Sequence, residues 1–468
     1  MAEEAGQLKF AVLICLLVGF TGCTGTAESR LRKTLATQTT GSIALPTGVI
    51  EISSELKLAP GAHDLEIVGS GSIIKAANNF KGRGLFVAEN ARAIRFRDFS
   101  IDGNREAFSA PQEMAPSENA YRIFYTTSGI VLDRVEGVEI SEVRFSSIPS
   151  FAMVVSRSSK IRIKNVVVED SGSLNAKGRN NTTGGIVIEE GSSDFEVRDS
   201  QFRRIRGNAL WTHSLFTSPR LHDGVFTANR FTQIGRDAIE IGAASKVRVE
   251  GNTGDHIGYP PEAVDVENQG IPVAIDTAGN VDLSTYIHNK FDEIDGKCID
   301  LDGFHDGSVI ENQCASRGSP DSYLFGHFGI VMNDTDPNMR SQNVEIRGNT
   351  IDGAKYGGLF LMGSGHQVIG NSFLHLNTAH CNETKQFVCI YKPDEPKMLE
   401  SGIYLSKGVV RLEDVRSNVI RGNTISGYKM KSRCITLGPG VAERENSIGA
   451  NTCEDYSTEA SHPLGRGR

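Results

Sequence analysis

A short pattern of apolar and variable positions recurs along the chain between Gly129 and Leu437. Each copy starts with a small residue and then alternates apolar and variable residues. Clear copies are GIVLD (129–133), GIVIE (185–189), AIEIG (238–242), CIDLD (298–302), GIVMN (329–333), GLFLM (358–362), GIYLS (402–406) and CITLG (434–438). Alternation with a period of two predicts β-strands rather than helices. Most copies lie about 23 to 36 residues apart, a repeat length typical of solenoids in which each unit stacks on its neighbours.

A column of asparagines follows the strand pattern at a constant position. Its members are Asn229, Asn252, Asn289, Asn312, Asn349, Asn371, Asn423 and Asn451. The earlier copies place Asp98, Glu142, Asn165 and Asp199 at the same position. Asn tolerates left-handed turn geometry, and stacked Asn side chains can form hydrogen bonds from coil to coil. The column is therefore predicted to support the fold rather than the chemistry.

These repeats resemble the coils of the pectin lyase-like superfamily, whose members form right-handed parallel β-helices. The stretches IALPTGVIEISSELKL (43–58) and FRDFSIDGNREAF (96–108) are similar to the first coils of its pectate-lyase and polygalacturonase-like branches. The resemblance covers residues 41–456 and implies an all-β, single-stranded solenoid of roughly a dozen coils. Because that superfamily contains lyases, hydrolases, esterases and adhesins, the resemblance specifies the fold and leaves the reaction open.

The composition agrees with a long soluble β-solenoid. A chain of 468 residues exceeds the usual size of one globular core, but a solenoid grows in one dimension and needs no second core. Fifty Gly suit many tight corners. The net charge of −8 argues against nucleic acid as a partner and does not exclude a polysaccharide. We expect a monomer with a polysaccharide ligand or substrate.

The N-terminus predicts export. Residues 10–20 (FAVLICLLVGF) form an apolar run that is too short to span a bilayer and suits the core of a signal peptide. Cys23 follows the run by three residues and stands at the position of the lipidated Cys in bacterial lipoproteins. We therefore expect a signal peptide over residues 1–23, a polar tether over 24–40 and a flexible tail over 457–468. Anchoring at the cell envelope through Cys23, a periplasmic location and secretion are all consistent with these segments.

Six cysteines follow the predicted signal peptide. An even number in an exported chain permits three disulfides. Cys381 and Cys389 lie in one inserted stretch, HCNETKQFVC, and are expected to pair. The other four are Cys298, Cys314, Cys434 and Cys453, which occupy matching positions in two coils. For these four, two disulfides and small buried core residues are both consistent with the sequence.

The alternation also separates inward from outward side chains. The second and fourth positions of the pattern are apolar and should face the core, whereas the third and fifth should point outward. Outward third positions of the middle and late coils are Trp211, Glu240, Ala274, Asp300 and Tyr404, and outward fifth positions are His213, Asp276, Asp302 and Asn333. Carboxylates gather in the middle coils with aromatic residues on either side, which is typical of an elongated groove for a sugar chain.

The spacing of coils predicts which carboxylates are close. Adjacent coils lie about 4.8 Å apart, and residues two apart on a strand about 6.6 Å. Asp276 and Asp302 should then be direct neighbours, which would share a proton or bind a cation. Asp300 and Asp302 should stand about 6.6 Å apart, within the range of inverting glycosidases. Glu240 should lie two coils from Asp300, about 9.6 Å away.

Two histidines complete the densest titratable cluster of the chain. His305 follows Asp302 in GFHDG, and His327 opens the next coil in GHFG. The expected catalytic residues are Asp300, Asp302, Asp276, His305, His327 and Glu240. The expected substrate-binding residues are Trp211, His213, Lys297, Asn333 and Tyr404. Trp211 and His213 are equally consistent with a patch beneath a loop.

The polygalacturonase pattern is present only in part. GHFG (326–329) resembles the Gly-His-Gly element of those enzymes, but Gly296 and Lys297 stand where their paired aspartates should precede it. Asp237 resembles the second of those aspartates but lies three coils before GHFG. The resemblance therefore does not imply an ordinary polygalacturonase, and a hydrolase would have to use Asp300 and Asp302 instead.

Three functions remain open from the sequence. A glycoside hydrolase would use the central carboxylates as acid and base. A polysaccharide lyase acting on uronates would use Lys297, Arg236 or Lys355 as base, with Ca²⁺ held by Asp276, Asp302 and Asn333 as the one candidate cofactor. A glycan-binding or surface-display solenoid would need no chemistry.

Three insertions interrupt the coils. They are residues 106–127, 172–183 and 377–400, the last containing Cys381 and Cys389. Insertions on β-solenoids commonly wall a binding groove. The side of the solenoid from which they project does not follow from the sequence.

Overall fold

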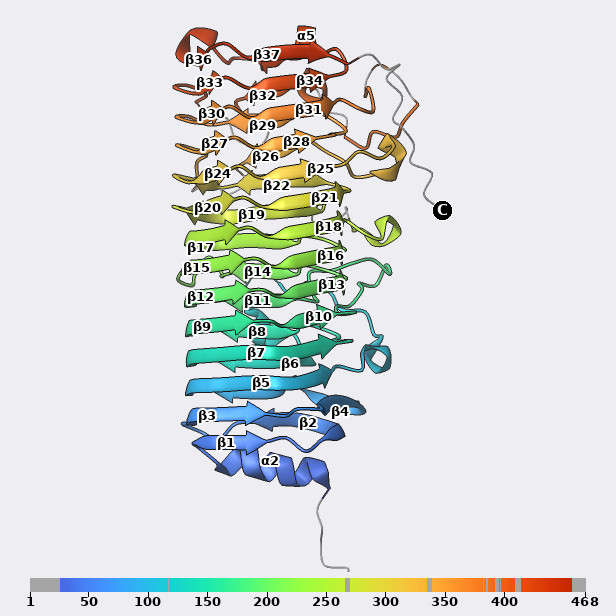
Figure 1. Ribbon diagram of the computed structural model, residues 1–468, viewed down its shortest axis with the longest axis vertical. Helices are drawn as coiled ribbons and strands as arrows, with labels where there is room; N and C mark the ends of the chain where they lie inside the picture. The colour runs from blue at the N-terminus through green and yellow to red at the C-terminus, as the bar shows by residue number, and fades with distance from the viewer. Residues whose placement is uncertain are drawn as a thin grey trace, which may run out of the picture.

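The computed structural model describes residues 26–116, 118–265, 270–334, 339–381, 383, 386–391, 395, 397–408 and 414–456. Over these residues the chain winds into a right-handed parallel β-helix, with its coils stacked along the long axis of the molecule (Figure 1). Every strand pairing between coils is parallel, because each strand meets its equivalent in the next coil. The predicted fold is confirmed. The predicted signal peptide, Cys23 and the predicted tail lie outside the described residues.

Three stacks of strands form the walls of the helix, and the copies of the sequence pattern form the first. Stack I consists of the end of β4 (Ser72–Glu89), β6 (Ser128–Asp133), β8 (Met153–Ser156), β11 (Ile186–Glu189), β14 (Leu210–His213), the starts of β17 (Ile239–Glu250) and β19 (Val273–Asp282), β22 (Lys297–Asp302), β26 (Ile330–Asn333), β29 (Leu359–Met362), β32 (Ile403–Ser406) and β35 (Ile435–Leu437). This stack carries the candidate functional positions.

Stack II follows stack I in each coil. It consists of β1 (Gly41–Ala44), β3 (His63–Val68), the starts of β5 (Arg92–Asp102) and β7 (Glu136–Ser146), β9 (Ser159–Lys164), β12 (Ser193–Arg198), β15 (Leu221–Thr227), the end of β17, β20 (Thr285–Ile287), β24 (Ser308–Ile310), β27 (Glu345–Arg347), β30 (Gln367–Ile369), β33 (Val419–Arg421) and β36 (Ser447–Ile448). The two-residue β23 (Phe304–His305) pairs with the end of β19 at the corner between stacks I and II.

Stack III closes each coil and leads into the next. It consists of β2 (Gly48–Lys57), the start of β4, the ends of β5 and β7, β10 (Val167–Glu169), β13 (Gln201–Ile205), β16 (Arg230–Ile234), β18 (Thr253–Ile257), β21 (Lys290–Ile294), β25 (Gln313–Ala315), β28 (Thr350–Asp352), β31 (Ser372–Leu376), β34 (Thr424–Gly427) and β37 (Thr452–Asp455).

Helical segments are few and short. They are α2 (Ala27–Thr37), α3 (Tyr121–Phe124), α4 (Lys397–Glu400), α5 (Met430–Arg433) and the single 3-10 turns η1 (Arg105–Phe108), η2 (Pro261–Ala263), η3 (Pro320–Ser322) and η4 (Glu443–Glu445). Among the described residues, none of the helices combines the length and the apolar character that a bilayer span requires.

Helix α2 replaces most of the expected polar tether. It covers the N-terminal end of the solenoid below β1 (Figure 1), with Leu31 and Leu35 buried against the core. The expectation for residues 24–40 was wrong because only these two leucines, four residues apart, mark the apolar side of an otherwise polar segment. Two buried side chains are enough here, since the helix has only to cover the open end of a core that the strands have already built.

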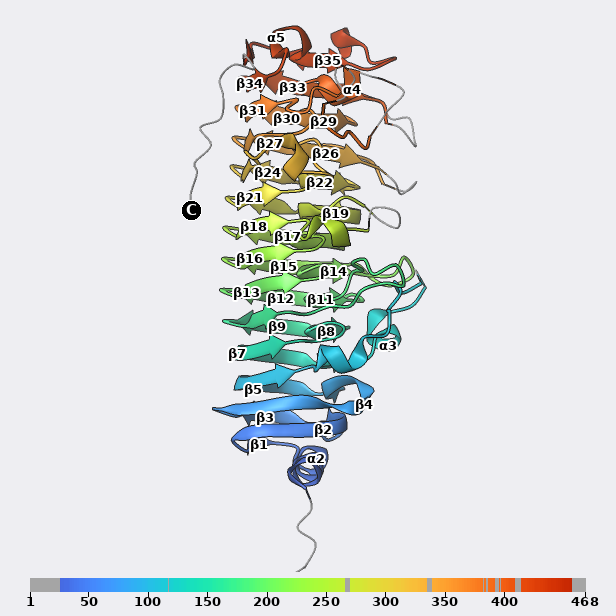
Figure 2. The ribbon, with the colours of Figure 1, turned by 90° about the vertical axis from the view of Figure 1, so that its right-hand side faces the viewer.

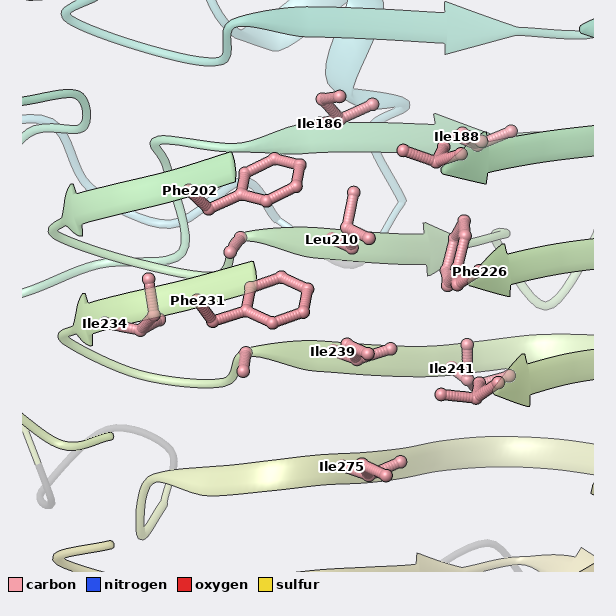
Figure 3. Close-up of a cluster of buried hydrophobic side chains, with 14 of the residues drawn as sticks. Ile186, Ile188, Phe202, Leu210, Phe226, Phe231, Ile234, Ile239, Ile241 and Ile275 are labelled. Carbon is pink, nitrogen blue, oxygen red and sulfur yellow. The ribbon is translucent and has the colours of Figure 1, made fainter. Parts of the chain in front are cut away.

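Inward side chains fill the helix as continuous columns. Figure 3 shows Ile186, Leu210, Ile239 and Ile275 of stack I following one another into the interior, all fully or almost fully buried. From stack III, the rings of Phe202 and Phe231 stack with centroids 5.2 Å apart. Burial of each such side chain stabilises the fold by about 1.5–3 kcal/mol, so the core is built coil by coil from the alternation seen in the sequence.

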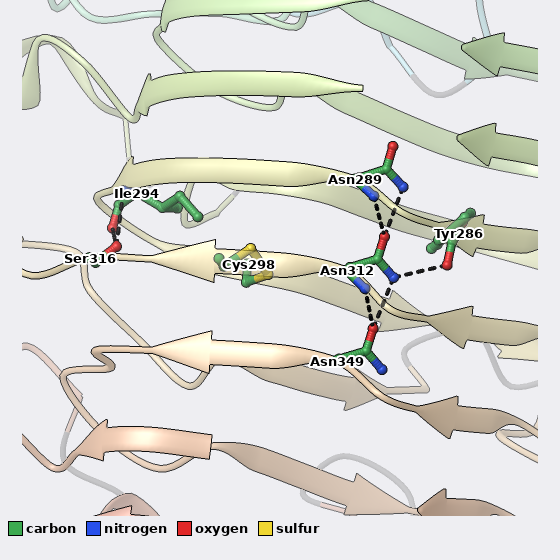
Figure 4. The surroundings of a disulfide bond; sticks show 8 residues. Tyr286, Asn289, Ile294, Cys298, Asn312, Ser316 and Asn349 are labelled. Atoms are coloured by element: carbon green, nitrogen blue, oxygen red, sulfur yellow. Dashed lines mark hydrogen bonds between the residues drawn. A yellow bond between two sulfur atoms is a disulfide. The ribbon is translucent and has the colours of Figure 1, made fainter. Parts of the chain in front are cut away.

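The asparagine column forms a continuous ladder at the corner between stacks II and III. Figure 4 shows one section, in which Asn289 donates to Asn312 and Asn312 donates to Asn349. The Asn312 amide donates to the Tyr286 carbonyl at 2.9 Å and to the Asn349 carbonyl oxygen at 3.0 Å. Its own oxygen accepts from the backbone N–H and the amide of Asn289 at 3.1 and 2.8 Å. The structural role predicted for the column is confirmed.

The ladder position differs from the expectation in the early coils. The left-handed backbone conformation belongs to the residue before each ladder Asn, such as Gly251, Gly348 or Gly370. Asp98, Glu142, Asn165 and Asp199 have this same left-handed conformation, so they align with those glycines and not with the ladder. The ladder instead begins at Ser200, whose backbone N–H donates to Asn229 at 3.1 Å. The sequence predicted that the Asn makes the left-handed turn. The preceding residue makes the turn instead, and the Asn side chain forms the hydrogen bonds between coils.

Three disulfides are present. Cys381 pairs with Cys389 as predicted, and the four matched cysteines form Cys298–Cys314 (Figure 4) and Cys434–Cys453. These four cysteines therefore form disulfides and are not unpaired core residues. Cys298 of β22 in stack I pairs with Cys314 of β25 in stack III, and Cys434, which directly precedes β35 of stack I, pairs with Cys453 of β37 in stack III. Three disulfides are typical of an exported protein.

Removal of one ladder side chain should destabilise the whole solenoid. Asn312→Ala would leave two buried donors of Asn289 and the Tyr286 carbonyl without their partner, so we expect a loss of roughly 2–4 kcal/mol in the free energy of unfolding. The measurement is urea denaturation of the full chain. Asn79→Ala, at an exposed position of β4, is the matched control and should change stability by less than about 0.5 kcal/mol. Equal stability of the two variants would contradict a supporting role for the ladder.

Candidate functional site

The outward face of stack I has covered third positions both before and after its middle coils. Before them Val131, Val154 and Val187 are covered, and after them Phe360 and Tyr404 are covered. Partly exposed outward side chains occur between His213 on β14 and Asn333 on β26. This window contains the expected carboxylates.

The register of one coil differs from the expectation. Glu240 pairs with Asp276, and Ile275 pairs with Ile299, so Asp276 lies beside Asp300 rather than beside Asp302. The sequence around Asp276 alternates over several residues, and a slip of two positions keeps every apolar side chain inward. The alternation therefore could not distinguish the two registers. Glu240, Asp276 and Asp300 occupy one position of three successive coils, and we call them the carboxyl ladder.

A fourth carboxylate joins the ladder at its N-terminal end. Oxygen atoms of Asp237, Glu240 and Asp276 all lie within 4.8 Å of one another. The backbone N–H of Val273 donates to Asp237 at 2.9 Å, and the amide of buried Asn208 donates to Glu240. Asp237 was noted in the sequence only as an isolated likeness to polygalacturonases. Its place became visible once the coil register was known.

Burial and mutual repulsion raise the pKa values of these acids. Burial, followed by the nearby Asp237 carboxylate, raises the pKa of Glu240 to about 8, against the opposing effect of Arg236. Burial also raises the pKa of Asp237 to about 6. The pKa of Asp276 is raised well above its ordinary value by burial and then by Asp237, Asp300 and Glu240. This end of the ladder therefore holds protons at neutral pH.

Asp300, at the other end of the ladder, is surrounded by donors. Lys297 forms an ion pair with it, and the Asn333 amide and the Leu301 backbone N–H each donate to Asp300 at 3.0 Å. Burial lowers the pKa of Lys297, but Asp300 and then Asp276 more than offset this and hold it above its ordinary value. Asp300 is thus an acceptor in every contact, as an ionised carboxylate is. Asp302, on the same strand, pairs with Asn333.

A cavity of about 880 Å³ opens over the N-terminal end of the ladder. Its floor contains Trp211, Arg236 and Glu240. The insertions 106–127 and 172–183 form part of its wall, and Figure 2 shows these segments and α3 gathered beside β8, β11 and β14. The side from which the two insertions project, which the sequence could not provide, is therefore the side of stack I.

The expected aromatic platforms are largely covered. Tyr404 is only 2% exposed and stacks on Phe360 with centroids 5.9 Å apart, so it offers almost no surface to a ligand. Trp211 is 5% exposed because Tyr121 lies 5.0 Å from it, centroid to centroid. Of the two interpretations of Trp211, a patch beneath a loop describes most of its surface, although the residue also borders the cavity. Alternation predicted the outward direction of both rings but not the segments that cover them.

The three histidines occupy different surroundings. His213 stacks on Tyr121 at 4.3 Å, and burial lowers its pKa to about 4, so it borders the cavity as a neutral ring. His305 lies at the corner between stacks I and II, where it contacts Asp306 at 2.7 Å and Asn280 at 3.1 Å. His327 lies at the start of stack I, 4.7 Å from the ring of Tyr391. Burial and then Lys297 lower the pKa of His327 well below its ordinary value.

The predicted site is therefore assembled in part. The structure brings together Glu240, Asp276, Asp300, Lys297 and Asn333, with Asp302 beside them. His305 reaches the cavity only through Asn280, and Tyr404 is buried elsewhere on the face. The polar cavity residues that the sequence pattern did not mark are Asn175, Asn180, Asn181, Thr182 and Asn280. They lie on insertions and corners, where no repeat position identifies them.

A cation would meet a different set of ligands from the one expected. Because Asp276 lies beside Asp300, the set Asp276, Asp302 and Asn333 is not formed as predicted. Asp237, Glu240 and Asp276 offer three carboxylate oxygens close enough to share an ion. Their raised pKa values mean that an ion would have to displace protons first.

The protonated state of Glu240 can be tested by stability alone. Between about pH 4.3, the pKa of an unfolded Glu, and pH 8 the folded protein holds a proton that the unfolded chain releases. This contribution to stability is complete below the lower value and is lost as the pH rises to the upper one. Glu240→Gln cannot titrate, so its stability relative to the wild type should rise between pH 5 and pH 9, by about 1.4 kcal/mol per pKa unit at most.

Chemical denaturation at the two pH values measures this difference. Glu250→Gln at the far end of the same strand is the matched control, because the hydrogen bond from Arg248 lowers the pKa of Glu250. It should show no gain as the pH rises. A constant difference between Glu240→Gln and the wild type would contradict a buried, protonated Glu240.

Comparison with known proteins agrees with the observed fold. The sequence profile of the right-handed β-helix region matches residues 83–271 and 177–373. No curated protein matches the chain. Similar solved structures include Geobacillus virus E2 ORF18, with 14% identity, 66% of this chain, 59% of that chain and a TM-score of 0.49. Polygalacturonase from Erwinia carotovora ssp. carotovora is similar over 70% of this chain and 91% of its own, with 13% identity and a TM-score of 0.50.

The surface adhesin PfbA of Streptococcus pneumoniae is similar over 92% of this chain and 94% of its own, with 12% identity and a TM-score of 0.52. At these identities the structural similarities concern the fold alone. The sequence profile matches more than half of the chain, and the chain belongs to the right-handed β-helix family.

Proposed function

We propose that this protein hydrolyses glycosidic bonds, with the carboxyl ladder as its acid and base. One observation carries the proposal: the two ends of the carboxyl ladder have opposite surroundings. Glu240 has a pKa of about 8, whereas Asp300 accepts hydrogen bonds from Lys297 and Asn333. Two titratable groups whose surroundings favour different protonation states commonly serve as the acid and the base of one site.

Each end of the ladder has a distinct role in this mechanism. Protonated Glu240 donates its proton to the glycosidic oxygen as the bond to the sugar breaks. Carboxylate Asp300 accepts a proton from the attacking water. The two residues lie two coils apart, about 9.6 Å from the coil spacing, close to the separation of about 6.5–9.5 Å in inverting glycosidases. Lys297 and Asn333 keep Asp300 oriented and ionised, and are positioning residues.

The cavity suits sugar hydroxyl groups. Its partly exposed polar side chains include Arg220, Arg236 and Asn280, which can donate hydrogen bonds to sugar hydroxyl groups. Asn175 and Asn181 also border the cavity, but they are buried and use their amides within the protein. Of the carboxyl ladder only Glu240 borders the cavity, and it is protonated at neutral pH, so charge repulsion does not decide between a neutral glycan and a uronate. Neutral glycans are the substrates to test first, beside a uronate polymer.

The lyase alternative loses two of its three candidate bases. Lys297 is paired with Asp300 and its pKa is raised, so it is a poor proton acceptor. Lys355 donates to the Tyr323 and Leu324 carbonyls and does not border the cavity. Arg236 borders the cavity together with Glu240 and is the base on which a lyase would have to rely. The non-catalytic alternative draws on the fold shared with the surface adhesin PfbA. It differs from our proposal in predicting binding without turnover.

Export and a polysaccharide outside the cell complete the proposal. The apolar run of residues 10–20 and the disulfides are both consistent with export. Anchoring through Cys23 would hold the enzyme at the cell envelope, one of the locations consistent with the sequence.

Loss of either end of the ladder should abolish turnover. We expect Glu240→Gln and Asp300→Asn each to lower kcat by about 10²–10⁴-fold, the contribution of one acid or base. The measurement is release of reducing ends from xylan, mannan, galactan, arabinan and polygalacturonate. Glu250→Gln, on the same strand as Glu240, is the control and should retain wild-type turnover. Near-ultraviolet absorbance of an unsaturated product would indicate a lyase instead, and binding without turnover would support the adhesin alternative.

The pH profile should report the acid. Glu240 works only while protonated, so kcat/KM should fall as the pH rises through about 8. The measurement is initial rate at low substrate concentration between pH 5 and pH 10. An alkaline limb near pH 5 would assign the acid to a group with an ordinary pKa and would contradict the role of Glu240.

A further inference from the structure

Resting on the proposed function, we infer that the protein cleaves glycans from a chain end and not at internal positions. The inference comes from the shape of the face around the carboxyl ladder. A polymer cleaved internally needs a groove that is open at both ends, whereas the site described here is a cavity that is closed toward the N-terminal coils and walled across the sheet.

The first wall closes the N-terminal direction. Tyr121 of α3 covers Trp211 and stacks on His213 with centroids 4.3 Å apart. Beyond it, the outward side chains of Val187, Val154 and Val131 are at most 1% exposed. Over the described strands on this side, the face of stack I has no surface left for a sugar chain.

This wall is anchored to the solenoid. The buried carboxylate of Glu189 accepts the backbone N–H groups of Tyr121 at 2.7 Å and of Arg122 at 3.1 Å. The hydroxyl of Tyr125 contacts the hydroxyl of Thr182 at 3.4 Å, which joins the first insertion to the second. Opening the wall would leave the Glu189 side chain buried without these donors, which is unfavourable. It is thus a fixed part of the site.

The opposite direction is covered only along the third positions of the strands. After Asp300 the third-position side chains Val331, Phe360 and Tyr404 are at most 4% exposed, and the last two rings are stacked. Figure 2 shows α4 on this side of the solenoid, near β29. The fifth-position side chains Asp302, Asn333 and Ser406 are partly exposed, so a chain that leaves the cavity follows them.

Side walls complete the enclosure. Across the sheet, the cavity is bordered by residues 180–182 of the second insertion on one side and by residues 214–216 after β14 on the other. The space between these walls is about 880 Å³, the size of a pocket that buries a small ligand rather than a polymer. The end of a glycan therefore enters the cavity, with the bond to be cleaved over the ladder and the rest of the chain leading out past Asp302.

Product analysis on neutral polysaccharides tests this inference. With full-length wild-type protein on xylan, mannan, galactan and arabinan, we expect one short saccharide from the earliest time points, with viscosity almost unchanged while reducing ends accumulate. A rapid fall in viscosity with products of many lengths would overturn the inference and leave hydrolysis standing. Absence of cleavage on every polysaccharide would instead overturn the proposed function, and the inference with it.

A wall variant provides the second arm. Tyr121→Gly removes the ring that closes the N-terminal end, so the share of longer products and the fall in viscosity per bond cleaved should increase several-fold. Phe124→Ala, in the same helix and exposed, is the matched control and should leave the product pattern unchanged. If Tyr121→Gly keeps the wild-type stability and also the wild-type product pattern, Tyr121 does not close the site.

Discussion

The structure depends on one constraint, the parallel stacking of equivalent residues about 4.8 Å apart. In a β-solenoid each outward or corner position meets its own equivalent in the coils before and after. A side chain that forms hydrogen bonds with copies of itself is stabilised along the whole length of the stack. A side chain that cannot do so needs hydrogen-bond donors or opposite charges from other residues.

Asparagine and carboxylate are the two extremes of this rule. An Asn side chain carries both a donor and an acceptor, so successive Asn residues such as Asn289 and Asn312 hydrogen-bond to each other, and the backbone supplies the remaining partners. Stacked carboxylates only accept, and their charges repel. Glu240, Asp276 and Asp300 are tolerated because some hold protons and because Lys297 and Asn208 supply the missing donors. The same spacing therefore stabilises the asparagine ladder and raises the pKa values in the carboxyl ladder.

The insertions decide what the carboxyl ladder can reach. A bare solenoid would present stack I as an open face, and the outward direction of Trp211 and Tyr404 would make both rings available to a sugar. Tyr121 and the segments after Asp300 convert this face into a bounded cavity. The repeat therefore supplies the reactive groups, and the irregular segments between repeats supply the shape that selects a ligand.

The sequence was sufficient wherever a property depends on alternation alone. Strand positions, inward residues and the Asn column all follow from the period of two. It failed where two arrangements share the same alternation, as at Asp276, where a slip of two residues leaves the core unchanged. It also failed where burial comes from residues distant in the chain, as for Tyr404, and where few apolar residues are needed, as in helix α2. These are properties of neighbours in space, which a repeat specifies only after its register is known.

Lys297 illustrates how charged residues can exchange positions between the coils of a solenoid. It pairs with Val273 of the preceding coil, whose backbone N–H in turn donates to Asp237, so Asp237 and Lys297 lie in one line along the axis, two coils apart. Asp237 and Lys297 occupy equivalent places in their coils. Asp237 adds a negative charge beside Glu240, and Lys297 adds a positive charge beside Asp300. Because each coil contacts only its neighbours, exchanging an acid for a base at such a position changes the local proton affinities without changing the backbone. The absence of the polygalacturonase aspartates at Gly296 and Lys297 is then compatible with the acid–base chemistry that we propose, since the lysine at this position forms an ion pair with Asp300.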